Sequence, residues 1–267
     1  MGANHLCRLP CIMLRYVICW TIKCLANGLR PVFLAHFWAF PKKRFSIPDF
    51  SPALIRARRP KKIPRIIWQT NYSEKVTLSV YCNYLWNRIL SPTYEYRFVS
   101  NENSHSIIRD SFTNEIYEAY DQIQIGSAKA DYWRVLMLLN HGGVYVDIDA
   151  NLVWPPELFI EPDSEEFFIR TRTGETTNYF MASAPNSPLF QRIEATIRRN
   201  IEENVEESVF SMTGPAAIWP LLKDALISPK PYFITCHHGQ FVNRKLQYPD
   251  SEHDKWYMEQ RERSVLR

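Results

Sequence analysis

The sequence predicts an α/β domain with an apolar, basic helix attached at its N-terminus. From residue 65 onward, segments that alternate like strands are followed by segments with helical spacing. The 267 residues include 46% hydrophobic side chains, which is enough for one large core and excludes a disordered chain. A glycine pair at the centre of the chain separates a helical pattern from a strand pattern.

Residues 1–60 are expected to form an N-terminal membrane-associating segment and linker, and residues 61–267 the domain. Residues 1–65 hold thirteen of the 32 Lys and Arg residues but one of the 28 acidic residues, Asp49. The basic excess is therefore confined to the N-terminus, and the rest of the chain is acidic. Because the domain is acidic, nucleic acid is not expected as a partner.

An apolar stretch over residues 11–30, between Pro10 and Pro31, predicts a helix that lies on a membrane surface. Three basic residues interrupt it, and each would cost about 3 kcal/mol near the centre of a bilayer. They are Arg15, Lys23 and Arg30. Because they fall within roughly 80° of one another on a helical wheel, the apolar side is free to enter the membrane interface. Two alternatives stay open: a helix that docks on the domain, and a signal anchor of a secretory-pathway enzyme.

Four of the six cysteines lie in this N-terminal segment, without the spacing of a zinc site or a disulfide framework. Reduced thiols fit this pattern best, which favours a cytoplasmic setting. A cleaved signal peptide is not expected, because no small-residue cleavage site follows a short uncharged core.

The domain begins with strands and helices in alternation. Strands are expected near residues 65–69 and 94–99, with a helix near 75–90 between them and helices filling 103–120. This order is typical of an α/β sheet.

The central helix is predicted from apolar residues at positions i, i+3, i+4 and i+7. They form one stripe that should face the core: Tyr132, Val135, Leu136 and Leu139. Asp131 and Arg134 are three positions apart and so share another face, near the buried side of the domain. Gly142 and Gly143 end the helix, because glycine tolerates the left-handed conformation found just past a helix end.

A strand is expected immediately after the glycine pair. Its side chains alternate, with Val144 and Val146 on one side and Tyr145, Asp147 and Asp149 on the other. Two carboxylates two positions apart at the end of a strand suit Mg²⁺ or Mn²⁺, hard cations that take oxygen ligands. Such an ion can stabilise the charge of a departing diphosphate. The stretch therefore predicts a metal-dependent site for a sugar nucleotide.

Further elements are expected after the central motif. Strands are predicted over residues 166–170 and 178–184. A long amphipathic helix follows to about residue 204, with Ser187 as its cap and Pro188 in its first position. Residues 213–215, Thr-Gly-Pro, open another helix, and their hydroxyl and backbone N–H groups could face an acceptor as well as cap the helix.

Residues 130–149 resemble glycosyltransferase family 32, sugar transferases with an Asp-x-Asp motif. The family pattern is an Ala-Asp-x-x-Arg helix followed by Gly-Gly-x-Tyr-x-Asp-x-Asp, and each of these positions is matched. Similar blocks occur at residues 63–70, 94–99, 178–185 and 212–215. The resemblance covers about residues 61–220, and the family includes yeast initiating α-1,6-mannosyltransferases and bacterial capsule or lipopolysaccharide enzymes.

The resemblance implies a GT-A-type nucleotide-diphospho-sugar transferase fold with a central mixed sheet and a metal-bridged diphosphate. Asp147 and Asp149 would bind Mn²⁺ or Mg²⁺, with Asp149 in the closer contact. Asp131 and Arg134 would hold sugar hydroxyls and the edge of the diphosphate. Catalytic roles are therefore assigned to Asp131, Arg134 and Asp149.

The same resemblance assigns donor contacts to three further residues. Trp68 would stack on the nucleobase, with an ordinary core tryptophan as the alternative. Tyr145 would lie beside the diphosphate, with a strand-packing tyrosine as the alternative, and Asn178 would contact the donor sugar.

A third metal or phosphate ligand often comes from the C-terminal part of such folds. Two clusters there contain histidine, residues 237–239 and residues 251–256, and their spacing does not decide between them. We select His253 as the third metal ligand, with Trp256 beside it.

We therefore predict a metal-dependent glycosyltransferase that moves a hexose from a nucleotide-diphosphate sugar to a glycan acceptor. The product would belong to polysaccharide, lipopolysaccharide or glycolipid synthesis, and the resemblance implies retention of anomeric configuration. One alternative is a non-catalytic carbohydrate-binding or scaffold protein with the same fold, which the intact motif residues disfavour. The other is a metal-dependent phosphohydrolase, whose aspartyl-phosphate form usually has threonine where this chain has Asn151.

The expected partners are a nucleotide sugar, a glycan or glycolipid acceptor and a membrane surface. We expect the cytoplasmic face of a bacterial inner membrane, since the basic residues count against a spanning anchor. The alternative is a Golgi membrane, because eukaryotic members of the family are held there by one N-terminal helix.

Overall fold

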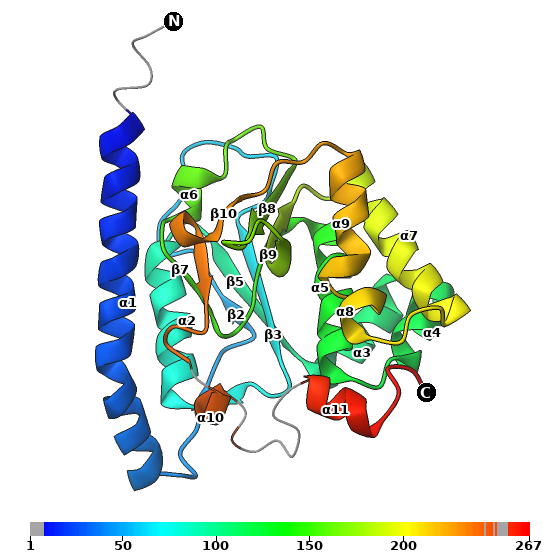
Figure 1. Cartoon of the computed structure of the whole chain (residues 1–267), viewed down its shortest axis with the longest axis horizontal. Helices are drawn as coiled ribbons and strands as arrows, with labels where there is room; N and C mark the ends of the chain where they lie inside the picture. Colours follow the sequence, from blue (N-terminus) through cyan, green and yellow to red (C-terminus); the bar gives the residue numbers. More distant parts are fainter. Residues whose placement is uncertain (1–7, 243, 248, 250–255) are drawn as a thin grey trace, which may run out of the picture.

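A computed structural model of the chain describes residues 8–242, 244–247, 249 and 256–267. Its centre is a seven-stranded sheet with helices on both faces (Figure 1). The strands lie in the order β10 (Lys230–Pro231), β8 (Glu166–Arg170), β9 (Thr176–Ser183), β6 (Gly143–Val146), β3 (Ile66–Asn71), β5 (Glu95–Ser100) and β2 (Phe50–Ser51). The predicted α/β class, with a mixed sheet and an N-terminal apolar helix, is confirmed.

The sheet is mixed because its central strands run in both directions. β3 is parallel to both β5 and β6, whereas β6 is antiparallel to β9. The carboxyl ends of β3, β5 and β6 therefore meet at one edge of the sheet. This edge is where ligands bind in open α/β sheets, and β6 delivers Asp147 and Asp149 to it.

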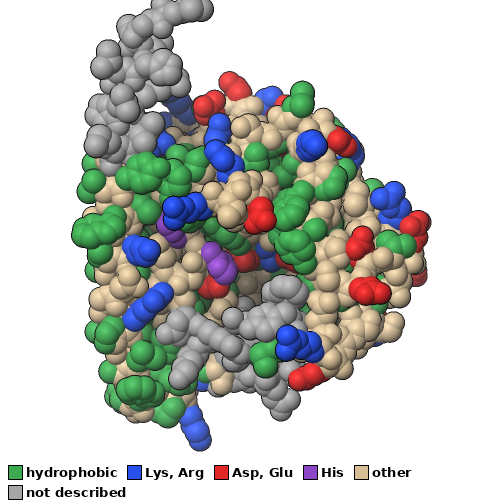
Figure 2. Space-filling model, viewed as in Figure 1, with side chains coloured by type: hydrophobic (Ala, Val, Ile, Leu, Met, Phe, Trp, Pro, Cys, Tyr) green, Lys and Arg blue, Asp and Glu red, His purple; other side chains and the backbone are tan. Residues whose placement is uncertain are grey.

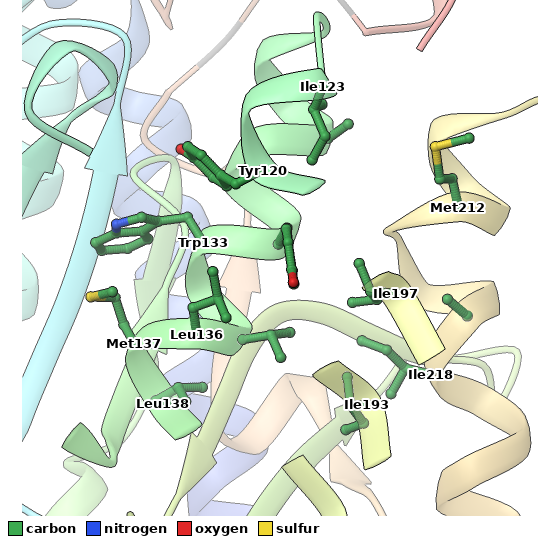
Figure 3. Close-up of a cluster of buried hydrophobic side chains, with 14 of the residues drawn as sticks. Tyr120, Ile123, Trp133, Leu136, Met137, Leu138, Ile193, Ile197, Met212 and Ile218 are labelled. Atoms are coloured by element: carbon green, nitrogen blue, oxygen red, sulfur yellow. The ribbon is translucent and has the colours of Figure 1, made fainter. Parts of the chain in front are cut away.

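One face of the sheet is covered by two layers of helices. α5 (Gly126–His141) packs on the strands, and α9 (Pro215–Asp224) contacts β9 beside it. The other helices on this face are α3 (Asn101–Ser111), α4 (Asn114–Gln122), α7 (Pro188–Glu203) and α8 (Val209–Met212). Apolar side chains from α5, α7 and α9 fill the space between these layers (Figure 3). α5 is buried well beyond the predicted stripe, and Trp133, Met137 and Leu138 are also inside. The reason is that helices pack on its outer side as well.

The opposite face is covered by α2 (Leu78–Leu90) and α1 (Arg8–Ala39). A small antiparallel pair also lies here, formed by β7 (Ala150–Leu152) and β11 (Cys236–His238). The remaining elements are β1 (Phe45–Ser46), β4 (Lys75–Val76), α6 (Pro156–Phe159), η1 (Tyr232–Ile234), α10 (Arg244–Gln247) and α11 (Trp256–Glu262). β7 and β11 matter most for the site, because they lie directly beside the Asp147–Asp149 turn.

α1 is one long helix that runs along the side of the domain (Figure 1). It continues through Pro31 to Ala39, so the prediction that this proline bounds the helix is wrong. Pro31 is exposed, and the carbonyl that loses its hydrogen-bond partner can face outward there. Within the described part of the chain, one helix is long and apolar enough to cross a membrane, over Leu14–Ala39.

The joint between α5 and β6 depends on two glycines. Gly142 and Gly143 have φ values of 65° and 107°, which side chains rarely adopt. A Cβ atom on Gly143 would lie 2.7 Å from the carbonyl oxygen of Ile66. The predicted glycine pair therefore ends the helix and lets β6 pass close to β3.

Candidate active site

Asp147 and Asp149 lie in a tight turn between β6 and β7. The turn is closed by a hydrogen bond from the Ala150 N–H to the Asp147 carbonyl, 2.9 Å long. As predicted from strand alternation, Val144 and Val146 join the core on the α2 side, and Tyr145 joins the core on the α5 side.

Two buried asparagines of α2 fix the backbone that follows Asp147. Asn83 Nδ2 donates to the carbonyls of Ile148 and Ala150, each at 2.9 Å. Asn87 donates to the Ala150 carbonyl at 2.9 Å and accepts from the Leu152 N–H at 2.8 Å. Both side chains are fully buried, so these bonds have no competition from water. The sequence analysis missed them, although their spacing of four residues puts both on one helix face.

His238 joins the two aspartates from a distant part of the sequence. It lies on β11, opposite Ala150 of β7, and its Nε2 atom is 3.1 Å from Asp149 Oδ1. Ligand atoms of Asp147, Asp149 and His238 all lie within 4.8 Å of one another. Figure 2 shows histidine and acidic side chains gathered at a hollow on this face of the molecule.

Charges in this cluster shift the pKa of its members. Burial opposes a charged His238 ring, but the Asp149 carboxylate outweighs it and raises the pKa of His238 to about 9. Burial raises the pKa of Asp147, with Arg134 acting in the opposite direction and Asp149 adding to the rise. A divalent cation would relieve the crowding of the two carboxylates, and two carboxylates with one imidazole form a donor set that suits Mn²⁺ or Mg²⁺.

Arg134 connects the aspartates to the central helix. Its Nη2 atom is 3.0 Å from Asp131 Oδ1 and 3.3 Å from Asp147 Oδ1. Its Nη1 atom donates to the carbonyl of Asn178 at 2.8 Å, and the guanidinium lies over the Tyr145 ring, 4.3 Å from its centroid. These contacts fix a positive charge beside the candidate metal ligands.

Asp131 is held by polar groups from two other elements. Asn178 Nδ2 donates to its Oδ1 atom at 2.8 Å, and the Thr213 hydroxyl donates to its Oδ2 atom at 3.5 Å. Burial raises the pKa of Asp131 to about 7, although Arg134 acts against the rise. Tyr145 completes the network by donating to Asp147 Oδ1 at 2.6 Å. Five of the predicted residues therefore form one connected cluster, which Thr213 joins.

Another predicted residue, Trp68, lies apart from this cluster. Trp68 is 5% exposed, donates from its indole N–H to the Gly142 carbonyl at 2.9 Å, and packs edge-on against Trp133. This placement favours the alternative of a core tryptophan, and its stacking on a nucleobase stays a prediction. His253 lies outside the described residues, and so does the side chain of Trp256. Within the described residues, His238 occupies the position for which His253 was selected.

Comparison with known proteins finds a family match in the central part of the chain. Residues 79–166 match the family described as the glycosyltransferase sugar-binding region containing a DXD motif. This region includes α2, α5 and β6, and it contains Asp131, Arg134, Asp147 and Asp149. The predicted resemblance to family 32 is thereby confirmed.

Several relatives are named as glycosyltransferases. An initiation-specific α-1,6-mannosyltransferase of Schizosaccharomyces pombe is 28% identical over 192 residues, which cover 59% of this chain and 47% of that protein. A putative glycosyltransferase of Saccharomyces cerevisiae, HOC1, is 25% identical, covering 59% of this chain and 48% of that protein. Inositol phosphoceramide mannosyltransferase 2 of Schizosaccharomyces pombe is 26% identical, covering 54% of this chain and 42% of that protein. The chain spans about half the length of the curated relatives it matches.

Among solved structures, the PaToxG glycosyltransferase superimposes with a TM-score of 0.49 and 12% identity, covering 80% of each chain.

Proposed function

We propose that this chain transfers a hexose from a nucleotide-diphosphate sugar to a hydroxyl group of a glycan or glycolipid. Its residues 79–166 match the glycosyltransferase sugar-binding region containing a DXD motif. One observation carries this proposal. Asp147, Asp149 and His238 converge at the edge of the sheet, directly beside the buried Asp131–Arg134 pair. Ligands for a divalent ion and a fixed guanidinium are what a departing diphosphate requires.

Asp147, Asp149 and His238 would hold Mn²⁺ or Mg²⁺. When bound, the ion supplies positive charge that stabilises the leaving nucleoside diphosphate. Arg134 contributes a second positive charge, which cannot swing away because it is bonded to Asp131, Asp147 and the Asn178 carbonyl. Positioning and charge stabilisation therefore supply most of the catalysis.

Asp131 and Asn178 would orient the sugar of the donor. The Asp131 carboxyl group, with a pKa of about 7, can accept a hydrogen bond from a sugar hydroxyl when ionised. Asn178 and Thr213 keep this group in place by donating to its two oxygens. The transfer is retaining, and the anomeric coupling constant in the ¹H NMR spectrum of the product tests this.

Mannose is the first donor sugar to test, because two of the relatives are named as mannosyltransferases. The name of one of these relatives gives inositol phosphoceramide as its acceptor, which supports a lipid-linked acceptor for this chain. A membrane surface is then the natural location. The outward side of α1 supports it, because Trp20 and Trp38 on this side are 68% and 76% exposed.

The experiment is a panel of GDP- and UDP-sugars, each incubated with Mn²⁺ or with chelator, and scored for released nucleoside diphosphate. The intact chain is compared with Asp149→Ala and with Asp163→Ala, an exposed aspartate outside the cluster. We expect one donor to turn over with Mn²⁺, a loss of at least a hundredfold in Asp149→Ala, and no change in Asp163→Ala. Binding of a sugar without turnover would instead indicate a carbohydrate-binding protein, and release of inorganic phosphate a phosphohydrolase.

A further inference from the structure

α1 contacts the segment that carries His238 at three places. Cys19 Sγ lies 2.9 Å from Nε2 of His237, and Arg30 Nη2 donates to the Gly239 carbonyl at 3.2 Å. The Tyr16 ring stacks on Phe233 with 4.5 Å between centroids. The two hydrogen bonds fall on the residues immediately before and after His238. α1 thus holds this short segment from the side opposite to the aspartates.

His237 is fixed at both nitrogens of its ring. Its Nε2 atom faces Cys19, and its Nδ1 atom lies 2.9 Å from Gln240 Nε2. The ring also packs edge-on against Tyr232, with centroids 5.0 Å apart. His237 is a buried residue, whereas the His238 side chain is half-exposed. The orientation of the His237 ring is therefore set by groups on its own side of β11, one of them on α1.

Strand geometry transmits this constraint to His238. Neighbouring side chains of a strand point to opposite faces, so His237 faces α1 and His238 faces Asp149. β11 has three residues, and its register pairs His237 with Asn151 and His238 with Ala150. The Gly239 N–H also donates to the Asp149 carbonyl at 3.0 Å. A shift of His237 or Gly239 would therefore move His238 relative to Asp149.

We propose that α1 is a positioning element of the metal site, in which Cys19 and Arg30 hold His237 and Gly239 and thereby aim His238 at the ion. This inference rests on the proposed function, because it assumes that Asp147, Asp149 and His238 bind a divalent cation. It assigns a role in the site to a helix that lies wholly outside the matched family region, residues 79–166.

The test measures Mn²⁺ binding by the full chain, using the free Mn²⁺ signal in electron paramagnetic resonance. The variants are Cys19→Ala and the double variant Cys19→Ala with Arg30→Met, and the conservative variant is Cys19→Ser. Cys24→Ala is the matched control, because Cys24 is exposed on the same helix. We expect the double variant to bind Mn²⁺ about tenfold more weakly, since partners behind a metal ligand contribute roughly this much. Cys19→Ser should bind within about twofold of the wild type, and so should Cys24→Ala.

A double-mutant cycle separates positioning from simple stabilisation of the fold. In a His238→Ala background, Cys19→Ala with Arg30→Met should cause no further loss of Mn²⁺ affinity, because the ligand that α1 positions is already gone. An equal loss in both backgrounds would overturn the inference. So would a double variant that binds Mn²⁺ as tightly as the wild type, and in that case the metal site itself would stand. Absence of Mn²⁺ binding by the wild-type chain would overturn the proposed function together with this inference.

Discussion

At the scale of single residues, the buried carboxyl group of Asp131 links stability to function. Its pKa in the folded chain is about 7, because burial disfavours the ionised form. Between its ordinary value of 3.8 and about 7, the folded chain keeps a proton that the unfolded chain has lost. Stability therefore falls as the pH rises through this window, and the loss is complete above pH 7.

Replacing Asp131 with asparagine should remove this loss. We expect Asp131→Asn to raise the free energy of unfolding by about 4 kcal/mol at pH 8 and to leave it nearly unchanged at pH 4. The same variant should lose sugar transfer, since the carboxylate is gone. Urea unfolding at both pH values in the presence of chelator measures the difference. An equal gain at both would mean that ionisation of Asp131 is not its cause.

We predict that the His238 ring releases a proton when the metal ion binds. With a pKa of about 9, raised by Asp149 against the effect of burial, the ring is charged at pH 7. A histidine ring must lose its extra proton to bind a metal, so Mn²⁺ binding at pH 7 should release about one proton, and affinity should rise with pH up to about 9. Calorimetry in buffers with different ionisation enthalpies counts this proton. His238→Gln should abolish the release, and its persistence in that variant would assign the proton to another group.

Sequence spacing could predict most of this cluster but not its third ligand. Asp131 and Arg134 meet because they are three positions apart on a helix. Asp147 and Asp149 lie close together because they belong to the same turn. His238 reaches them through the pairing of β11 with β7, two short strands far apart in the chain. Local pattern does not encode such pairing. The sequence pattern also did not decide whether Trp68 stacks on a nucleobase or packs in the core.

At the scale of elements, α2 acts as a clamp on the backbone around Asp149. Asn87 satisfies both the Ala150 carbonyl and the Leu152 N–H, and it is fully buried. Asn87→Ala would remove the partner of the buried Leu152 N–H, whereas the Ala150 carbonyl would keep its hydrogen bond from Asn83. We therefore expect a loss of about 1–3 kcal/mol of stability. Thermal unfolding measures this, with the exposed Asn114→Ala as the control. If the two variants unfold at the same temperature, water has replaced the clamp.

Helices and strands whose apolar residues repeat with a clear spacing could be predicted, and elements too short to show such a repeat could not. The strands expected near residues 65–69 and 94–99 correspond to β3 and β5, and the strand expected at 166–170 is β8. α7 begins after Ser187, whose hydroxyl accepts from the Phe190 N–H as its predicted cap. β7 and β11 have three residues each, too few for alternation to be recognised. α1 runs through Pro31, because tertiary packing outweighs the cost of one proline.

At the scale of the whole molecule, α1 has two sides with different contacts. Ile22, Ala26 and Phe33 are buried against the domain. Trp20 and Trp38 belong to the exposed, apolar side, and hydrophobic side chains gather over this edge in Figure 2. The predicted membrane-surface helix and its alternative, a helix docked on the domain, are thus compatible with each other. The docked arrangement uses contacts that a helix crossing the bilayer would give up.

The outward tryptophans should determine how strongly the protein binds vesicles. We expect Trp20→Ser with Trp38→Ser to weaken partitioning onto anionic phospholipid vesicles by at least tenfold, without changing turnover of a soluble donor. Sedimentation with vesicles measures this. Leu226→Ser is the control, because Leu226 is 90% exposed and lies outside α1. Equal binding by all three proteins would show that α1 is not the membrane contact.

The docking of α1 also has a practical consequence for anyone who prepares the protein. A single apolar helix is commonly deleted to obtain a water-soluble fragment of a membrane enzyme. Here the deletion would uncover the apolar side of α2 and the core residues beneath Ile22 and Phe33. The fragment would lose the exposed hydrophobic side of α1 but would expose the hydrophobic side of α2 instead, and it would be prone to aggregate. A full-length chain with polar residues at its outward tryptophans is the better reagent for crystallisation and assay.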